Sequence, residues 1–246
     1  MRLHTRVMGS GPRVVFVHGS LTTSEQSWGK QEVLAERWTL VIPDRRGYAP
    51  NPIADRSDFE DDAADIAPLL DGSAHLVGHS YGATVALCIA GLEPDAVRSL
   101  TLIETPPTSL VRGDPPIEQL IAAFEDRRTS ISDPYQFMRA HLETLGAPLD
   151  RLPNPLPEAI DCQVRLLMNE RPPWELHPSS ALTASPFPKL VISGDHSPAF
   201  ERLCDVIADS IGGERAHLAG RGHTIPTTGE PYNALIQEFM LRAEAR

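Results

Sequence analysis

The sequence predicts an α/β protein with a mostly parallel central sheet flanked by helices. Short runs rich in Val, Ile and Leu alternate with stretches of helical periodicity, which is typical of repeated strand–helix units. A glycine-flanked serine, in GHSYG at 78–82, joins one such run directly to a helical pattern. Between residues 106 and 188 the alternation stops and prolines accumulate, which predicts a helical insert.

Six apolar runs are the expected core strands. They are Val14–Val17, Thr39–Ile42, His75–Val77, Ser99–Ile103, Lys189–Ile192 and Arg215–Leu218. Nearly continuous apolar runs of this kind suit a sheet that is covered on both faces. The segment before Gly11 is expected to add an edge strand.

Helices are expected between and after these strands. Ser57-Asp58-Phe59-Glu60 has the S-x-x-E form of a capping box, and Ser197-Pro198 places proline at a first helical position. The expected ranges are about 57–70, 84–90, 197–211 and from 230 onward in the sheet domain, and 117–127, 134–144 and 157–168 in the insert. Residues 1–105 and 189–246 then form the core, and residues 106–188 form a helical cap.

Composition limits the class of protein. The chain has 246 residues, 41% of them hydrophobic and 22% charged, as in an ordinary globular protein. A net charge of −11 disfavours nucleic acid as a partner. No apolar run suggests a signal peptide or a membrane span, and the three scattered cysteines suggest neither disulfides nor a metal site. A cytoplasmic protein without a membrane partner is expected, and a homodimer is left open.

The GHSYG segment raises a physical question, because glycines on both sides of a serine are costly in regular structure. A sharp strand-to-helix turn would need them, since neighbouring backbone would pass too close for a Cβ atom. Such a turn, a nucleophile elbow, projects the serine hydroxyl into a cleft. Ser80 is therefore the candidate nucleophile.

A serine nucleophile needs a base, and the base needs an orienting acid. Asp195 follows the run at 189–192, and His223 lies in the glycine-rich turn after the run at 215–218. The carboxyl ends of parallel strands gather functional groups, so these side chains are expected beside Ser80. The order serine, aspartate, histidine along the chain matches one of the known triad arrangements.

An oxyanion intermediate needs backbone N–H donors. The amide of Tyr81, directly after the nucleophile, is one expected donor. The run at 14–17 leads into His18-Gly19-Ser20, and the amide of Ser20 is the expected second donor.

Together, HGS at 18–20, DRRGY at 44–48, GHSYG, SGD at 193–195 and GRGH at 220–223 resemble the α/β-hydrolase superfamily. The resemblance covers the whole chain, with 106–188 as the variable cap. It implies an eight-stranded, mostly parallel sheet and a Ser-Asp-His triad that needs no metal or organic cofactor. Haloalkane dehalogenases of this superfamily carry aspartate at the elbow, so Ser80 disfavours that chemistry.

Several neighbouring residues compete for roles in the site. Glu104 ends the run at 99–103 and is the alternative acid or a pocket residue, although Asp195 has the more usual position. His18 and His79 are expected to support the site rather than to act as the base, and His196, although adjacent to Asp195, is expected to point elsewhere.

Two further sets of residues lie in or near these motifs. Asp44 with Arg45-Arg46 is interpreted as an ion pair that fixes its loop. The candidates for lining the pocket are aromatic: Trp28, Tyr81, Phe124, Phe137 and Trp174.

The sequence thus predicts a serine hydrolase that cleaves a small or medium carboxylic ester or lactone through an acyl-enzyme. Two other classes stay open. One is a ligand receptor with a hydrolase fold and slow turnover, and the other is a C–C hydrolase, lyase or cyclase that uses the same pocket.

Overall fold

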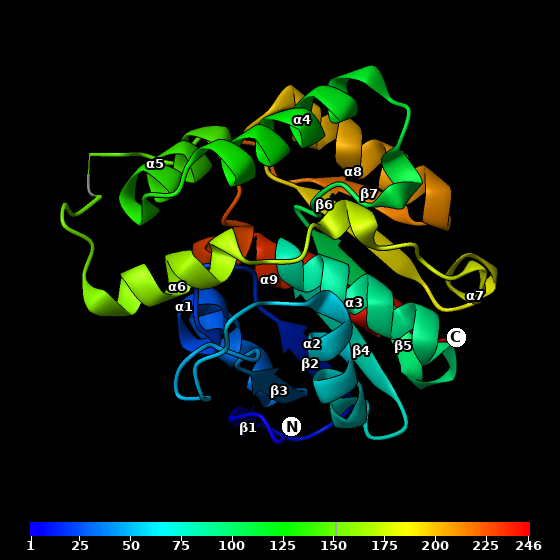
Figure 1. Cartoon of the computed structure of the whole chain (residues 1–246). Coiled ribbons are helices and arrows are strands. Elements are labelled where there is room, and N and C mark those ends of the chain that lie inside the picture. Colours follow the sequence, from blue (N-terminus) through cyan, green and yellow to red (C-terminus); the bar gives the residue numbers. More distant parts are fainter. Residues whose placement is uncertain (151) are drawn as a thin grey trace.

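One sheet of seven strands runs through the centre of the protein, whose computed structural model describes residues 1–150 and 152–246 (Figure 1). The strands are β1 (Thr5–Met8), β2 (Arg13–Val17), β3 (Thr39–Pro43), β4 (Ala74–His79), β5 (Val97–Ile103), β6 (Lys189–Ser193) and β7 (Glu214–His217). Their order is β1-β3-β2-β4-β5-β6-β7, and all pairs are parallel except the antiparallel pair of β1 and β3. The α/β class is confirmed, with seven strands in the described residues where eight were expected.

Alternation along the strands explains why the sheet needs cover on both faces. In β2, Val15 and Val17 join one hydrophobic cluster, while Val14 and Phe16 join the other. Successive side chains of a strand point to opposite faces, so an apolar run places hydrophobic groups on both. Both faces must therefore be covered by helices.

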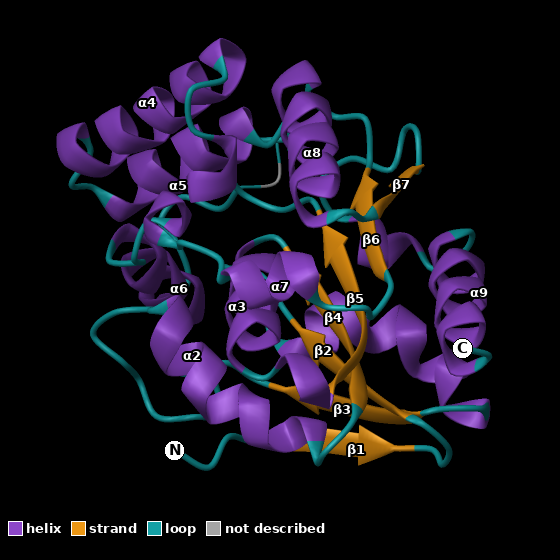
Figure 2. Cartoon of the chain, turned by 90° about the vertical axis from the view of Figure 1, so that its right-hand side faces the viewer, coloured by secondary structure: helices purple, strands orange, loops and turns teal. Residues whose placement is uncertain are grey.

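The helices divide between these two faces (Figure 2). The first cluster includes α2 (Phe59–Ile66), α3 (Tyr81–Leu92) and α8 (Pro198–Ile211), and the second includes α1 (Ser24–Trp28) and α9 (Tyr232–Glu244). Short 3-10 segments cover 29–36, 67–70, 94–96, 109–111, 173–175 and 225–228.

The predicted start of α2 is off by one residue. Its N-cap is Asp58, whose carboxylate accepts a hydrogen bond of 2.9 Å from the amide of Glu60. Ser57 lies outside the helix, because Asp58 supplies the capping acceptor two residues before Glu60. The predicted start of α8 at Pro198, after Ser197, is confirmed.

Residues 106–188 are helical, and no strand occurs in their described part. They contain α4 (Pro115–Ser130), α5 (Pro134–Thr144), α6 (Glu158–Met168) and α7 (Ser180–Ala184). Helices α5 and α6 pack together around a small cluster of their own, which includes Phe137, Val164 and Leu167. Helix α4 contacts α8, and α7 contacts α3. In both views α4 and α5 lie together at the end of the molecule opposite β1 (Figures 1 and 2).

Within residues 1–150 and 152–246, no helix combines the length and apolar character that a bilayer crossing requires.

Candidate active site

Ser80 lies at a strained turn between β4 and α3. Its φ angle is +52°, in a region that costs a non-glycine residue free energy. A Cβ atom on Gly78 would lie 2.4 Å from the carbonyl oxygen of Gly82. A Cβ atom on Gly82 would lie 2.2 Å from the carbonyl oxygen of Val17. The two glycines are therefore needed for close backbone approach on either side of the serine.

His223 faces Ser80 from the loop after β7. Its Nε2 lies 3.1 Å from the Ser80 Oγ. The loop reaches this position through Gly220 and Gly222, whose φ angles are +72° and +66°. Such a contact lets the imidazole accept the serine proton.

His79 supports this arrangement from inside the elbow. Burial, followed by the nearby His223, lowers the pKa of His79 to about 3, so its ring is neutral. Its Nε2–H donates to the backbone carbonyl of His223 over 2.8 Å. His79 thus fixes the loop that carries His223, in line with the supporting role expected for it.

Glu104 is the carboxylate that reaches His223. Its Oε2 lies 3.2 Å from the His223 Nδ1, and its Oε1 accepts a hydrogen bond of 2.6 Å from the Gly194 amide. The side chain is fully buried at the end of β5. Burial alone would raise the pKa of Glu104, but contacts with His196 and His223 outweigh it and lower the pKa to about 2. The ionised carboxylate favours the imidazole tautomer with its proton on Nδ1.

The expectation that Asp195 serves as the acid is wrong in this geometry. Asp195 is exposed after β6, with a φ angle of +61°, and its amide donates to the Glu201 Oε1 over 2.9 Å. The preceding Gly194 packs against the loop of His223, where an added Cβ would lie 2.0 Å from the Gly222 carbonyl oxygen. The two loops therefore meet backbone to backbone, and the buried side-chain position beside His223 belongs to Glu104.

A second histidine contacts the same carboxylate. The Nδ1 of His196 lies 3.1 Å from the Glu104 Oε2, and its ring packs edge-on to His223 at 5.4 Å between centroids. Among the described residues, only Glu104, His196 and His223 form a cluster of metal-ligand type, with ligand atoms within 4.8 Å of one another. A cation there would have to replace the hydrogen bond that orients His223, so these residues fit a triad better than a resident metal.

The two expected oxyanion donors border the same cavity as Ser80. Gly19 permits this, because a Cβ on it would lie 2.9 Å from the Ser80 Cβ. No hydrogen bond among the described residues uses the amide of Ser20 or Tyr81. Both amides are therefore free to bind an oxyanion.

Two consecutive residues of the insert, Glu170 and Arg171, accept hydrogen bonds from the side chains of Ser20 and Tyr81. The Ser20 hydroxyl donates to the Glu170 Oε2 over 2.6 Å. The Tyr81 hydroxyl donates to the backbone carbonyl of Arg171 over 3.0 Å. The segment after α6 thus fixes the oxyanion loop and the elbow from the side of the cap.

His18 ties the oxyanion loop to the DRRGY segment. Its Nδ1–H donates to the Gly19 carbonyl over 2.7 Å, and its Nε2 accepts from the Arg45 amide over 2.9 Å. Burial, followed by the charge of Arg45, lowers the pKa of His18 well below its usual value, so the ring is neutral. His18 thus has the supporting position expected of it.

Asp44, Arg45 and Arg46 of the DRRGY segment each hold a loop in place, but they bind different partners and do not pair with one another. Arg45 is fully buried 3.6 Å from carboxylate oxygens of both Asp62 and Glu170. Arg46 pairs with Asp65 at 2.8 Å. Asp44 instead accepts a hydrogen bond of 2.7 Å from the Ser24 amide, so the expected pairing of Asp44 with the arginines is wrong.

Glu170→Gln should change how stability depends on pH. Burial raises the pKa of Glu170 from 4.5 to about 7, against the attraction of Arg45 and the Ser20 hydrogen bond. Between these two values the unfolded chain ionises first, so Glu170 makes the folded state less stable as pH rises. Glutamine does not titrate. The Tm of the variant minus that of the wild type is expected to rise between about pH 5 and about pH 8.

The matched control is Glu158→Gln, which removes an exposed carboxylate at the start of α6. Its Tm difference from the wild type should stay nearly constant over the same range. A Glu170→Gln difference that stays flat, or falls with pH, would contradict a buried carboxyl with a raised pKa.

The cavity in front of Ser80 has a volume of about 280 Å³ and a mostly apolar wall. Phe124, Phe137 and Trp174 line it together with Tyr81. Trp28 does not, and its expected pocket role is wrong. It is the last residue of α1 and is fully buried in the second hydrophobic cluster, with its ring centroid 4.9 Å from that of Phe16.

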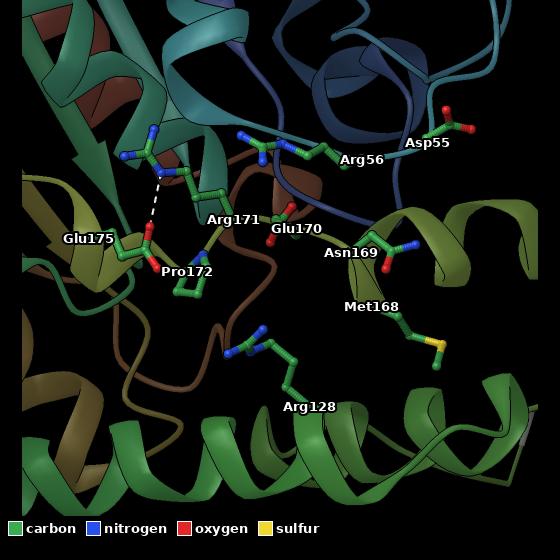
Figure 3. Close-up of a pocket in the computed structure, with 9 residues that line it drawn as sticks. All are labelled: Asp55, Arg56, Arg128, Met168, Asn169, Glu170, Arg171, Pro172 and Glu175. Carbon is green, nitrogen blue, oxygen red and sulfur yellow. Dashed lines mark hydrogen bonds and ion pairs between the residues drawn. The ribbon is translucent and has the colours of Figure 1, made fainter.

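A second hollow of about 650 Å³ lies outside this cavity and is open to solvent (Figure 3). Its wall is polar, and Arg56, Arg128 and Arg171 gather around it. Glu170 borders both spaces. The carboxylate that holds Ser20 therefore stands in the wall between the catalytic cavity and the outer hollow.

Several residues that line or control this site could not be predicted from any sequence motif. Glu170, Arg127 and His141 all come from the insert and belong to no catalytic motif. Their positions depend on how the insert folds over the strand ends. The His196 contact with Glu104 was likewise not expected.

Comparison with known proteins fits this geometry. Residues 14–237 match the model of the alpha/beta hydrolase family. A relative from Mesorhizobium japonicum, 2-(acetamidomethylene)succinate hydrolase, is 36% identical over 110 residues, covering 43% of this chain and 40% of that protein. The pimeloyl-[acyl-carrier protein] methyl ester esterase of Chromobacterium violaceum is 29% identical over 162 residues, or 61% of each chain. This chain spans less than two thirds of the length of either relative.

Among solved structures, a thermophilic esterase from Thermogutta terrifontis superposes with a TM-score of 0.68 at 22% identity. The superposition covers 98% of this chain and 93% of the esterase, and at this identity it supports the fold alone. The family match covers most of the chain, including the elbow, Glu104 and His223. The chain belongs to the alpha/beta hydrolase family.

Proposed function

We propose that this protein is a serine hydrolase that cleaves small or medium carboxylic esters or lactones through an acyl-enzyme. One observation carries the proposal. The Ser80 Oγ lies 3.1 Å from Nε2 of His223, whose Nδ1 lies 3.2 Å from the buried carboxylate of Glu104. This is the order of contacts that activates a serine hydroxyl.

Each step of the reaction then has a group in position. Ser80 attacks the carbonyl carbon while His223 takes its proton, and Glu104 stabilises the imidazolium that forms. The amides of Ser20 and Tyr81 donate hydrogen bonds to the oxyanion. His223 next gives its proton to the leaving alkoxide, which frees the alcohol and leaves the acyl group on Ser80.

Deacylation repeats these roles with water. His223 removes a proton from water as it attacks the acyl carbon, and then returns a proton to the Ser80 Oγ as the acid leaves. The cavity volume of about 280 Å³ and its apolar wall favour a substrate of small or medium size. The names of the two relatives, one a methyl ester esterase, are consistent with this class of reaction.

The acyl-enzyme can be tested with p-nitrophenyl esters of increasing chain length and with lactones. A burst of p-nitrophenol equal to the enzyme concentration, and an acyl adduct on Ser80 by mass spectrometry, are expected. Labelling by a fluorophosphonate without turnover of any ester or lactone would favour a receptor. Turnover of a substrate after complete labelling of Ser80 would favour a lyase or cyclase reaction.

A further inference from the structure

Arg127 faces the catalytic cavity from α4, in the same wall as the aromatic residues of the insert. Its guanidinium carbon lies 4.8 Å from the ring centroid of Phe124 and 5.2 Å from that of Phe137. Two rings thus hold the planar cation in one orientation. The side chain is fixed in place before any ligand arrives.

This cation forms no ion pair among the described residues, although Glu170, in the same cavity wall, attracts it from a greater distance. Its Nη1 donates to the Thr144 hydroxyl over 3.2 Å, while its Nε is buried without an acceptor. No described carboxylate lies within 4.0 Å of the guanidinium. Burial lowers the pKa of Arg127 to about 10, which still leaves it charged at neutral pH. A charge that is partly removed from water without a partner costs free energy.

The arginines that border the outer hollow are different, because each already pairs with a carboxylate, and Figure 3 shows one of these pairs, Arg171 with Glu175. Arg56 pairs with Asp58, Arg128 with Glu125 at 2.8 Å, and Arg171 with Glu175 at 3.1 Å. Arg127 is thus the guanidinium of this region whose carboxylate partner is missing. An anionic group inside the cavity would supply that partner.

His141 adds a second polar group to the same wall. Burial, followed by the charges of Arg127 and His223, lowers its pKa well below the usual value, so the ring is neutral. Its Nδ1 is buried without a hydrogen-bond partner among the described residues. A neutral imidazole can donate a hydrogen bond to a carboxylate oxygen without adding charge.

We propose that Arg127 binds a carboxylate of the substrate, which makes the enzyme selective for esters that carry a free acid group. This inference rests on the serine hydrolase function proposed above. Ser80 and His223 cleave the ester at one part of the cavity, and Arg127, with His141 beside it, binds the acid at another. Charge-assisted hydrogen bonds to a fixed guanidinium give both affinity and orientation.

The test compares charged and neutral esters of equal length. Monoethyl esters of dicarboxylic acids place the acid in the acyl part, and acetate esters of ω-hydroxy acids place it in the alcohol part. Ethyl esters of monocarboxylic acids and alkyl acetates are the neutral comparators. The wild type should favour one charged series by about tenfold or more in kcat/KM. The favoured series then identifies which part of the substrate reaches Arg127.

Arg127→Met keeps an unbranched apolar stem and removes the charged guanidinium. It should lower kcat/KM for the favoured charged series by about 10- to 100-fold, mainly through KM, and change the neutral series by less than about threefold. Arg127→Lys should retain part of the preference. Arg139→Met is the matched control, since Arg139 is an exposed arginine of α5 that pairs with Glu143 and does not border the cavity. It should leave the preference unchanged.

Inhibition of the wild-type enzyme tests the proposal even if the Arg127 variants fail to fold. Short monocarboxylates should inhibit hydrolysis of a neutral p-nitrophenyl ester more strongly than the uncharged amides of the same acids. Equal inhibition, no preference in either charged series, or equal losses on charged and neutral esters in Arg127→Met would overturn the proposal. Absence of neutral-ester turnover together with absence of Ser80 labelling would instead overturn the serine hydrolase function.

Discussion

Ser80→Ala is expected to lower kcat for ester hydrolysis by about 10⁴- to 10⁶-fold, the loss seen when a triad serine is removed. The Ser80 hydroxyl lies 3.1 Å from the Nε2 of His223 and is the group that this base would deprotonate. Alanine keeps the Cβ atom and the packing of the turn. Because only the hydroxyl is removed and the positive φ angle of residue 80 is retained, the Tm of the protein should be nearly unchanged.

Covalent labelling separates this loss of activity from a loss of fold. A fluorophosphonate should label the wild type once and the Ser80→Ala variant not at all. Ser132→Ala, at an exposed position between α4 and α5, is the control and should label and turn over as the wild type does. A labelled Ser80→Ala protein would mean that another residue is the nucleophile.

Glu104→Gln is expected to lower kcat by about 10⁴-fold, because glutamine neither stabilises the imidazolium nor fixes the proton on Nδ1. KM should change little, since Glu104 does not border the cavity that receives the substrate. Asp195→Asn should change kcat by less than about threefold, because the Asp195 side chain is exposed and is not in contact with His223. Both variants are measured on one activated ester.

Glutamine at 104 also faces the Gly194 amide, so the Tm of that variant must be recorded together with its activity. A folded Glu104→Gln protein should still react with a fluorophosphonate, although more slowly. A large loss in Asp195→Asn beside a small one in Glu104→Gln would overturn the assignment of the acid. Large losses in both would mean that two carboxylates act on one histidine.

The sequence by itself determined the elbow and the loop of the base, because both depend on local backbone constraints. Gly78 and Gly82 are needed where backbone passes close to backbone, and that requirement is visible as a glycine pattern. Apolar runs that alternate with helical patterns likewise determined the order of the core strands along the chain. The start of α8 followed from proline at the first helical position.

Only the tertiary structure decided which carboxylate serves His223. Glu104 and Asp195 both follow neighbouring parallel strands, and both have a positive φ angle, of +50° and +61°. The positions of the two residues after their strands therefore do not show which carboxylate contacts His223. The loops of Gly194 and Gly222 meet backbone to backbone, and Glu104, buried at the end of β5, is the carboxylate that reaches the Nδ1 of His223.

The same reason explains Arg127 and Glu170. Each is a charged residue of a helical insert whose local pattern is that of an ordinary amphipathic surface helix or its end. Their roles arise from the path of the insert over the strand ends, which brings α4 to the cavity and Glu170 to Ser20. Burial of such a charge depends on contacts between residues far apart in sequence. It therefore cannot be predicted from local helix propensity or hydrophobic periodicity.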